Sequence, residues 1–393
     1  MHVLFIPSAY PIEEVPLSSI FYKEQALAIK ERGNKVGVIF SETRRVSKIS
    51  RNMLIKNHFQ IGRYNEDSLI TYRLHGWNIF TMRGKLGINF WVKQSLNLFK
   101  KYIKEEGLPD IIHVQSALYG GLVALEIKKK YNIPFVITEH SSSVLQGILR
   151  RHDVHILKEV YNNADYRISV GGALKKAIEA YSYKKVEVIP NIVDIDKFSI
   201  DYSNRNNDEF TFISICHLKE NKNVDLTIKA FNEVLKVHNN ARLIVVGDGP
   251  EKENLIDLSK KFNINSRIDF VGAISREDLN KYINKANAFV LPSKYETFGI
   301  VYIEALACGL PIITSKCGGP EDFFSEEIGY MIPVGDVNKL EKAMFSIIKN
   351  ITKFNANYLR EYVENRFSNK VISEKIINVY TKVLSGNGDI NEE

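Results

Sequence analysis

Cysteine is scarce in this sequence: Cys216, Cys308 and Cys317 are the only three among 393 residues, and none forms a CxxC pair. Three thiols cannot all pair internally, which argues against a disulfide-stapled domain and favours buried thiols in a reducing cytoplasm. Long apolar runs are also missing, because no stretch approaches the ~18–20 residues that a membrane-spanning helix needs. The first residues, MHVLFIPSAYP, contain no basic leader, and their apolar stretch ends at Pro7. We therefore expect a cytoplasmic protein.

Basic residues outnumber acidic ones only in the first half of the chain. Residues 1–190 carry 28 Lys and Arg against 17 Asp and Glu, a net +11, whereas the remainder carries 25 against 29, a net −4. The densest stretch, 44–101, has 12 basic residues opposed only by Glu66 and Asp67, and it includes the aromatic residues Trp77, Phe80, Phe90, Trp91 and Phe99. This asymmetry predicts two different partners, with an anionic membrane surface or an anionic acceptor for the first half. A solvated basic face explains the same pattern equally well.

Short apolar runs alternate with amphipathic segments along the first half. We expect strands at HVLFIPS, KVGVIF, DIIHVQS, PFVITEH, YRISVG and VEVIPN, and helices at about 20–32, from Gly120, near 154–163 and at about 173–180. Gly33 is a stop signal for the first helix. The basic stretch between KVGVIF and DIIHVQS is expected to be irregular. Continuous apolar strands alternating with helices predict a parallel sheet covered on both faces.

The second half restarts the series after the polar stretch DYSNRNNDEF. Strands are expected at TFISIC, RLIVVG, IDFVG, AFVLPS, PIITS and GYMIPV, and each but the last is followed by a helical segment. The predicted fold class is α/β, with two Rossmann-like, doubly wound domains at 1–190 and 191–365, joined near 191–201. One long helix is expected near 356–384, and its end, from about 366, packs back on the first domain. Residues 385–393 are expected to form a frayed tail.

A carboxylate stands where a hydrocarbon packs better in the stretch SKYETFGIVYIEALACGLP (293–311). Glu304 lies among Val, Tyr, Ile, Ala and Leu on an expected helix, and Glu296 lies eight positions earlier in a loop after a strand. Gly299 lets the backbone approach a ligand, and the free N–H groups of a helix start favour a phosphate. Helical side chains lean toward the N-terminus, so Glu304 suits a ribose diol at this mouth while Glu296 suits a second sugar. The pattern predicts a nucleotide-sugar site; a solvent-facing Glu304 and a turn acid at Glu296 are the alternative.

Cations are expected to face these acids from the loop after TFISIC. Lys222 is the best candidate for binding a diphosphate, and His217 contributes if it is protonated or donates from a neutral tautomer. A surface lysine and a core histidine are the commoner explanation of either residue alone. Gly247, at the strand end VVGDGP, is a further candidate for donor contact, although its surroundings match neither G-x-G-x-x-G nor a P-loop.

The first half offers a smaller set of candidates. Glu139 and His140 follow the strand PFVITEH before a loop of small residues, where a histidine can hydrogen-bond a sugar hydroxyl or shape an acceptor site. A purely structural histidine is an equally good explanation. Ser18 and Ser19 lie in the long loop after the first strand, where they are candidates for a phosphate contact.

Together these features resemble the retaining glycosyltransferases of family four, which have the GT-B fold of two Rossmann-like domains facing across a cleft. The resemblance covers almost the whole chain, from PSAYP and IFYKEQALAIKERGNKV through VIPNIVD and VVGDGP to ETFGIVYIEALACGLPII. Its most specific element is an acid-x7-acid pattern, intact at Glu296 and Glu304. The resemblance implies that Glu296 contacts the transferred sugar, that Glu304 holds the ribose, that Lys222 binds the diphosphate and that His140 lies beside the reacting carbon. It also implies donor contacts from the backbone of Thr297, Phe298, Gly299 and Ile300.

Two positions depart from the family pattern. The family usually has Gly-Arg where this chain has Cys216-His217, which weakens one of two diphosphate cations and makes donor binding dependent on pH. The first loop commonly carries a glycine where this chain has Ser19. The family implies transfer with retention at the anomeric carbon, no metal and no other cofactor, with a nucleotide sugar of the UDP or GDP type as the donor.

The lead hypothesis is therefore an enzyme that moves a sugar from a nucleotide donor, bound by the second domain, to a saccharide acceptor bound by the first. A lipid-linked acceptor in cell-surface polysaccharide assembly fits the basic first half, and would place a cytoplasmic protein peripherally on the inner face of the plasma membrane. A GT-B nucleotide-sugar epimerase, which needs no acceptor, and a non-catalytic two-lobed sugar-binding protein are the alternatives. A nucleic-acid binder, suggested by a pI of 9.0, leaves Glu296 and Glu304 unexplained.

Overall fold

The computed structural model describes residues 1–12, 19–44, 60–77, 84–201, 203 and 208–386. The chain divides into two compact units. The first unit comprises Met1–Val170, Leu174–Ile189 and Ile372–Glu393, and the second comprises Gly171–Ala173 and Pro190–Val371. The three cysteines are free thiols.

The first unit is built on one eight-stranded sheet with the order β3-β4-β2-β1-β5-β6-β7-β8. All neighbouring strands are parallel except the antiparallel pair β3 and β4. The strands are β1 (His2–Pro7), β2 (Lys35–Arg44), β3 (Gln60–Glu66), β4 (Leu69–Trp77), β5 (Ile111–Gln115), β6 (Phe135–Glu139), β7 (Tyr166–Ser169) and β8 (Glu187–Val188). The helices of this half are α1 (Ile20–Glu31), α3 (Lys85–Glu106), α4 (Gly120–Tyr131), α5 (Ser142–Leu145), α6 (Arg151–Asn163) and α7 (Gly172–Glu179).

The central strands of this sheet are buried on both faces, as their continuous apolar sequences predict. Every residue of β5 and of β6 is buried, and only the first residue of β1 is partly exposed. Helix α1 ends at Glu31, and Gly33 follows with a φ of +80°, which is the left-handed stop conformation expected for that glycine. The direction of the strand order reverses between β1 and β5, so the unit has a topological switch point there.

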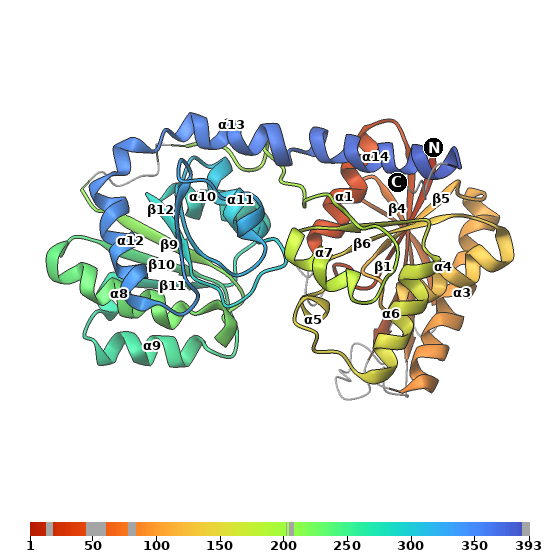
Figure 1. The fold of residues 1–393 in the computed structure, drawn as a ribbon, viewed down its shortest axis with the longest axis horizontal. Coiled ribbons are helices and arrows are strands. Elements are labelled where there is room, and N and C mark those ends of the chain that lie inside the picture. Colours follow the sequence, from red (N-terminus) through yellow and green to blue (C-terminus); the bar gives the residue numbers. More distant parts are fainter. Residues whose placement is uncertain (13–18, 45–59, 78–83, 202, 204–207, 387–393) are drawn as a thin grey trace. The chain divides into compact units, whose positions relative to one another are not determined.

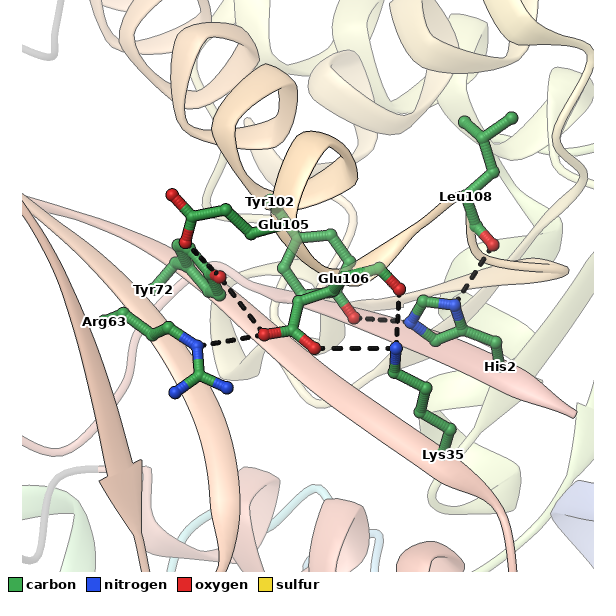
Figure 2. Close-up of polar contacts among 8 residues, drawn as sticks. All are labelled: His2, Lys35, Arg63, Tyr72, Tyr102, Glu105, Glu106 and Leu108. Carbon is green, nitrogen blue, oxygen red and sulfur yellow. Dashed lines mark hydrogen bonds and ion pairs between the residues drawn. The ribbon is translucent and has the colours of Figure 1, made fainter.

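A polar network joins the end of α3 to the sheet edge where β1 and β2 begin (Figure 2). The carboxylate of Glu106 accepts a hydrogen bond from Arg63 Nε at 2.9 Å, and Lys35 Nζ lies 3.5 Å from its other oxygen. Burial alone would raise the pKa of Glu106, but the hydrogen bonds from Arg63 and Tyr72 outweigh it and lower that pKa. His2 joins the network through the hydroxyl of Tyr102 at 2.6 Å. The network therefore fixes the C-terminal end of α3 at the edge remote from the carboxyl ends of these two strands.

The second unit contains a six-stranded parallel sheet with the order β11-β10-β9-β12-β13-β14. Its strands are β9 (Thr211–Ile215), β10 (Arg242–Val246), β11 (Ile268–Gly272), β12 (Ala288–Leu291), β13 (Ile312–Ser315) and β14 (Gly329–Ile332). Its helices are α8 (Val224–Val237), α9 (Lys252–Lys261), α10 (Arg276–Asn284), α11 (Ile300–Ala307), α12 (Val337–Lys349) and α13 (Ala356–Phe367). Figure 1 shows α8 and α9 on one face of this sheet, and α10 and α11 on the other. The strand order reverses between β9 and β12, which makes that pair the switch point of the second unit.

The stretch between β2 and β5 differs from the expectation of an irregular region. Residues 60–77 form a hairpin, β3 and β4, and residues 85–106 form the 22-residue helix α3. The turn of this hairpin contains no glycine that would predict it, because Asp67 and Ser68 supply its positive φ values. Strand β3 is largely exposed, so it has no hydrophobic pattern. The helix does have one, since Ile88, Trp91, Leu98 and Tyr102 are buried at helical spacing.

Two further expectations for the second half are wrong. Strand β14 is followed by helix α12, capped by Asp336, whose side chain accepts from Lys339 N at 2.9 Å, whereas β13 is followed only by the short 3₁₀ turn Pro320–Asp322. The long helix expected near 356–384 is two helices, α13 and α14 (Asn369–Leu384), separated by Ser368. Ser368 has an extended backbone and forms a β-bridge with Val193, so the helix must end there. From Ile372 onward α14 belongs to the first unit.

Within the described ranges, no helix combines the length and the apolar content that crossing a bilayer requires. Ser385 and Gly386 form a turn after α14, and the rest of the tail expected at 385–393 lies outside the described residues.

Candidate active site

Lys222 and Glu296 meet at the switch point of the second unit. Lys222 ends the 3₁₀ turn Glu220–Lys222 that follows β9, and Glu296 lies in the loop that follows β12. The Nζ of Lys222 donates to Oε1 of Glu296 at 2.6 Å, and Ser293 Oγ donates to the same oxygen at 2.9 Å. Ligands of open parallel sheets bind beyond the carboxyl ends of strands at such a point. The structure therefore brings together the two residues that the sequence placed on separate loops.

This ion pair is mostly buried but remains partly exposed to solvent. The side chains of Lys222 and Glu296 are 20% and 12% exposed. Burial alone would lower the pKa of Lys222, but the charge of Glu296 outweighs it and raises that pKa, so the lysine stays cationic. Burial also raises the pKa of the nearby Cys216 and Cys317 thiols to about 12, so both remain protonated. A cation held in a partly desolvated pocket is suited to binding a phosphate oxygen.

The loop from Glu296 to the start of α11 is held by its backbone. Glu296 N donates to Cys317 O and its carbonyl accepts from Gly319 N, both at 2.9 Å. Phe298 packs its ring against Phe323 and Phe367, with centroids 5.4 and 5.7 Å away. The ring of Phe298 is therefore a core group, and only the backbone of Thr297, Phe298 and Ile300 is suited to a ligand contact there.

Gly299 is required at the start of α11. Its φ of +89° lies in the left-handed region, and a Cβ built on it would lie 2.5 Å from the ring of Tyr302. The left-handed φ alone, or the lack of space for a Cβ alone, would disfavour any residue other than glycine at this position. Helix α11 therefore begins at Ile300, directly after Gly299, and the free backbone N–H groups at its start stay predicted ligand contacts.

Glu304 lies deeper than the sequence suggests. Its side chain is 0% exposed and forms an ion pair with Arg276, the first residue of α10. The guanidinium of Arg276 also lies over the ring of Phe198, 5.0 Å from its centroid. The sequence predicted a ribose diol as the partner of Glu304, whereas in the structure Arg276 pairs with this carboxylate. Sequence reasoning missed Arg276, although a basic residue at the first position of a helix is unfavourable to the helix dipole and was a usable signal.

His217 lies exposed beyond β9, and its ring is oriented by the next strand. Its Nδ1 pairs with the backbone carbonyl of Asp248. Because a carbonyl only accepts, Nδ1 carries the proton, and Nε2 of the neutral ring is an acceptor. Neutral His217 therefore cannot donate to a diphosphate from Nε2. Of the two ways in which the sequence expected His217 to bind a diphosphate, donation from the neutral ring is wrong. Gly247 has a φ of +133°, and its Cβ position would lie 1.8 Å from the carbonyl oxygen of Cys216, so it allows the two loops to touch.

Glu139 and His140 lie together at the end of β6 in the first unit. Glu139 Oε2 accepts from Ala117 N at 2.9 Å and from Tyr161 OH at 2.7 Å, and its Oε1 accepts from His140 N and Ser141 N at 2.9 Å. Because it already accepts four hydrogen bonds, this carboxylate holds the loops after β5 and β6 in place. It is not suited to binding an acceptor saccharide. His140 is 9% exposed, and its ring packs against Phe21 and Tyr22, whose centroids are 5.0 and 4.9 Å away from it and 4.5 Å from each other.

Ser19 caps the N-terminus of α1 with a φ of +57°, the left-handed conformation for which glycine is the usual residue. The left-handed backbone therefore explains why the family usually has glycine at this position. In this chain the serine adopts that conformation. Its side chain makes no capping hydrogen bond. Ser18, the other candidate of this loop, lies outside the described residues.

Two models of known protein families match the chain, one in each half. The family model of the Glycosyl transferases group 1 matches residues 196–366, and that of Glycosyltransferase Family 4 matches residues 20–197. Sucrose-phosphate synthase from Thermosynechococcus elongatus has a similar structure, with a TM-score of 0.79 and 21% identity over 98% of this chain and 100% of that one. Anabaena HepE, solved with UDP and glucose, has a TM-score of 0.73 and 16% identity over 97% of this chain and 99% of that one.

A curated relative shares more sequence over a shorter length. The phosphatidylinositol N-acetylglucosaminyltransferase gpi3 subunit of Schizosaccharomyces pombe is 29% identical over 207 residues. That match covers 52% of this chain and 45% of the gpi3 subunit, so the chain spans less than half the length of that relative.

Proposed function

Because the chain belongs to the group 1 and family 4 glycosyltransferases, with the GT-B fold, we propose that it is a retaining, metal-independent hexosyltransferase. Its donor is a nucleotide sugar of the UDP or GDP type, bound by the second unit. Its acceptor is a lipid-linked saccharide, bound by the first unit, in the assembly of a cell-surface polysaccharide.

The observation that carries this proposal is the Lys222–Glu296 pair at the switch point of the second unit. One cation and one carboxylate, 2.6 Å apart and both largely buried, offer complementary partners for a sugar diphosphate. The lysine suits the diphosphate, which is anionic, and the carboxylate suits sugar hydroxyls, which donate. Gly299 and the N–H groups of α11 border the same site. A structural ion pair needs none of these neighbours.

The proposed reaction replaces one bond at the anomeric carbon by another. The bond from that carbon to the diphosphate oxygen breaks, the bond to the acceptor oxygen forms on the same face, and the acceptor hydroxyl proton passes to the leaving phosphate oxygen. The task of the protein is then to position the sugar and to stabilise the developing negative charge of the leaving group. Lys222 supplies a fixed cation for that charge. His217 adds a second one only when protonated, and the proposal does not require a metal.

A cluster of lysines supports an anionic acceptor or surface for the first unit. Helices α3 and α4 border a hollow of about 330 Å³, and four exposed lysines line it, Lys93, Lys100, Lys129 and Lys130, which we call the α3–α4 lysine cluster. Glu126, which pairs with Lys129 at 2.8 Å, is the one acidic residue in this lining. The gpi3 subunit acts, by its name, on phosphatidylinositol, which is an anionic lipid. We therefore propose that the protein lies on the inner face of the plasma membrane.

The proposal is tested by following the purified protein with UDP- and GDP-linked hexoses by ¹H NMR, with and without saccharide and lipid-linked acceptors, in EDTA. The expected result is acceptor-dependent release of the nucleotide and a product with the anomeric configuration of the donor. A changed sugar without an acceptor would identify an epimerase instead, and an inverted product would refute the retaining mechanism. Activity that is lost in EDTA and restored by a divalent cation would refute metal independence.

A further inference from the structure

Glu296 is held in the candidate donor site by two groups that bind the same oxygen. Lys222 Nζ and Ser293 Oγ donate to its Oε1 at 2.6 and 2.9 Å. Within the described ranges, Oε2 of Glu296 accepts no hydrogen bond and is not one of the buried polar atoms that lack a partner, so solvent reaches it. The carboxylate therefore has one anchored oxygen and one oxygen that is open to a ligand.

Ser293 is a rigid support for the anchored oxygen. It lies just after β12 and is 0% exposed. Its carbonyl oxygen accepts from the hydroxyl of Ser315, the last residue of β13. The carbonyl of the preceding residue, Pro292, accepts from Asn223 Nδ2 at 2.8 Å. Because neither of these contacts involves Lys222, the position of the Ser293 hydroxyl does not depend on that cation.

A diphosphate that binds Lys222 takes this cation away from Glu296. The hydroxyl of Ser293 still donates to Oε1, because a carboxylate only accepts hydrogen bonds and the direction of the bond is therefore fixed. Without this bond Glu296 would regain side-chain rotamers and would have to be ordered again when the sugar binds. A carboxylate that is already oriented avoids that cost during the reaction.

We propose that Ser293 is a positioning residue, which keeps Oε1 of Glu296 anchored while Lys222 binds the diphosphate, so that Oε2 accepts from a hydroxyl of the transferred sugar. Because Ser293 is fully buried, it acts through Glu296 and does not contact the donor itself. It lies three positions before the first acid, outside the acid-x7-acid pattern. The inference rests on the proposed function for the role of Oε2, but the anchoring does not depend on any activity.

The anchoring is tested first, by crystal structures of the full-length unsubstituted protein, Lys222→Met and Lys222→Met/Ser293→Ala, without a nucleotide. Lys222→Met reproduces the loss of the cation that a bound diphosphate would cause. We expect the carboxylate of Glu296 to stay within about 3.2 Å of Ser293 Oγ in Lys222→Met. In the double variant it should leave this position. A carboxylate that already moves away in Lys222→Met, or that keeps its position in the double variant, would overturn the inference.

The second test compares UDP binding with sugar transfer in Ser293→Ala. Because Ser293 acts on Glu296 and not on the diphosphate, the affinity for UDP should stay within about twofold. The value of kcat/KM for transfer should fall roughly tenfold or more, which is the lower limit for losing a hydrogen bond to a charged group. Ser214→Ala is the matched control, because Ser214 is also 0% exposed but donates to the carbonyl of Val290. It should keep both UDP binding and transfer.

The possible outcomes separate the inference from the proposed function. Transfer that is unchanged in Ser293→Ala, or that falls equally in both serine variants, would refute the inference alone. A parallel loss of UDP affinity and transfer in Ser293→Ala would indicate a general structural role and would also refute it. If Glu296 stays anchored in Lys222→Met but the unsubstituted protein transfers no sugar, the proposed function fails and the anchoring stands.

Discussion

Substitutions of Lys222 and of Glu296 should change the affinity for a nucleotide in opposite directions. In the structure the lysine is occupied by the carboxylate at 2.6 Å, so a diphosphate must compete with Glu296 for the same cation. Lys222→Met removes the cation, whereas Glu296→Gln removes the competitor and a negative charge beside the phosphates. The first change should weaken UDP binding, and the second should strengthen it while it lowers sugar transfer.

The size of each effect follows from the shielding of the pair. A charge-assisted hydrogen bond is worth ~1.5–3 kcal/mol, so Lys222→Met should weaken UDP binding roughly 10- to 150-fold. Glu296→Gln should tighten UDP binding by about 1.4 kcal/mol or more, or tenfold, because two charges about 4 Å apart near a protein surface interact by several kcal/mol. The same substitution should lower kcat at least about tenfold, since the neutral amide accepts a sugar hydroxyl less strongly.

Isothermal titration with UDP measures both constants, and Lys236→Met is the control. Lys236 also forms an ion pair at 2.6 Å, with Glu233, but it is 63% exposed on α8 and should not affect binding. Both test variants break the same ion pair, so any loss of folding stability is common to them and cannot produce opposite effects on UDP. Weaker UDP binding in both variants would refute competition for Lys222.

Three further outcomes follow from other contacts. His217→Arg should tighten UDP binding at pH 8, because arginine donates whatever the pH, whereas His217 has its Nδ1 proton committed to Asp248; unchanged affinity would remove His217 from the donor site. Burial lowers the pKa of His113 to about 3, below its ordinary value of 6.5, so the stability that neutral His113 contributes is complete above pH 6.5 and is lost as the pH falls toward 3. Between pH 6.5 and pH 5 that loss is about 2 kcal/mol, and hydrogen exchange of the β5 amides should show it in the unsubstituted protein but not in His113→Gln; equal losses would contradict it. Neutralising the α3–α4 lysine cluster should lower partition onto anionic vesicles at least about 100-fold, at ~1 kcal/mol per lysine, whereas neutralising four exposed lysines of the second unit, Lys236, Lys260, Lys281 and Lys349, should not; equal effects would refute the membrane position.

The strands and the meeting of Lys222 with Glu296 could be predicted from sequence because their signals are local. Continuous apolar strands predict buried parallel sheets, and parallel sheets place the residues that follow their strands along one edge. Lys222 and Glu296 were found in this way, although they are 74 residues apart. Gly299 was found because a helix start near a ligand requires its backbone freedom.

Other features gave no such signal. Strand β3 is mostly exposed, and its turn uses Asp67 and Ser68 in place of glycine, so neither the hairpin nor its register was predictable. Arg276 acts through an ion pair with Glu304, which lies far away in sequence, and its only local signal is its place as a basic residue at the first position of a helix. Ser368 interrupts a helical pattern through a bridge to Val193, which is a tertiary contact that propensity does not contain.

The measurement that tests the central claim most directly is acceptor-dependent transfer of labelled sugar by the unsubstituted protein, Glu296→Gln and Lys236→Met, with the product detected by mass spectrometry. We expect the unsubstituted protein and Lys236→Met to form the product at equal rates, and Glu296→Gln to form it at least about tenfold more slowly while binding UDP at least as tightly. Equal rates in all three proteins would contradict the assignment of Glu296 to the transferred sugar, and with it the placement of the donor site at this switch point.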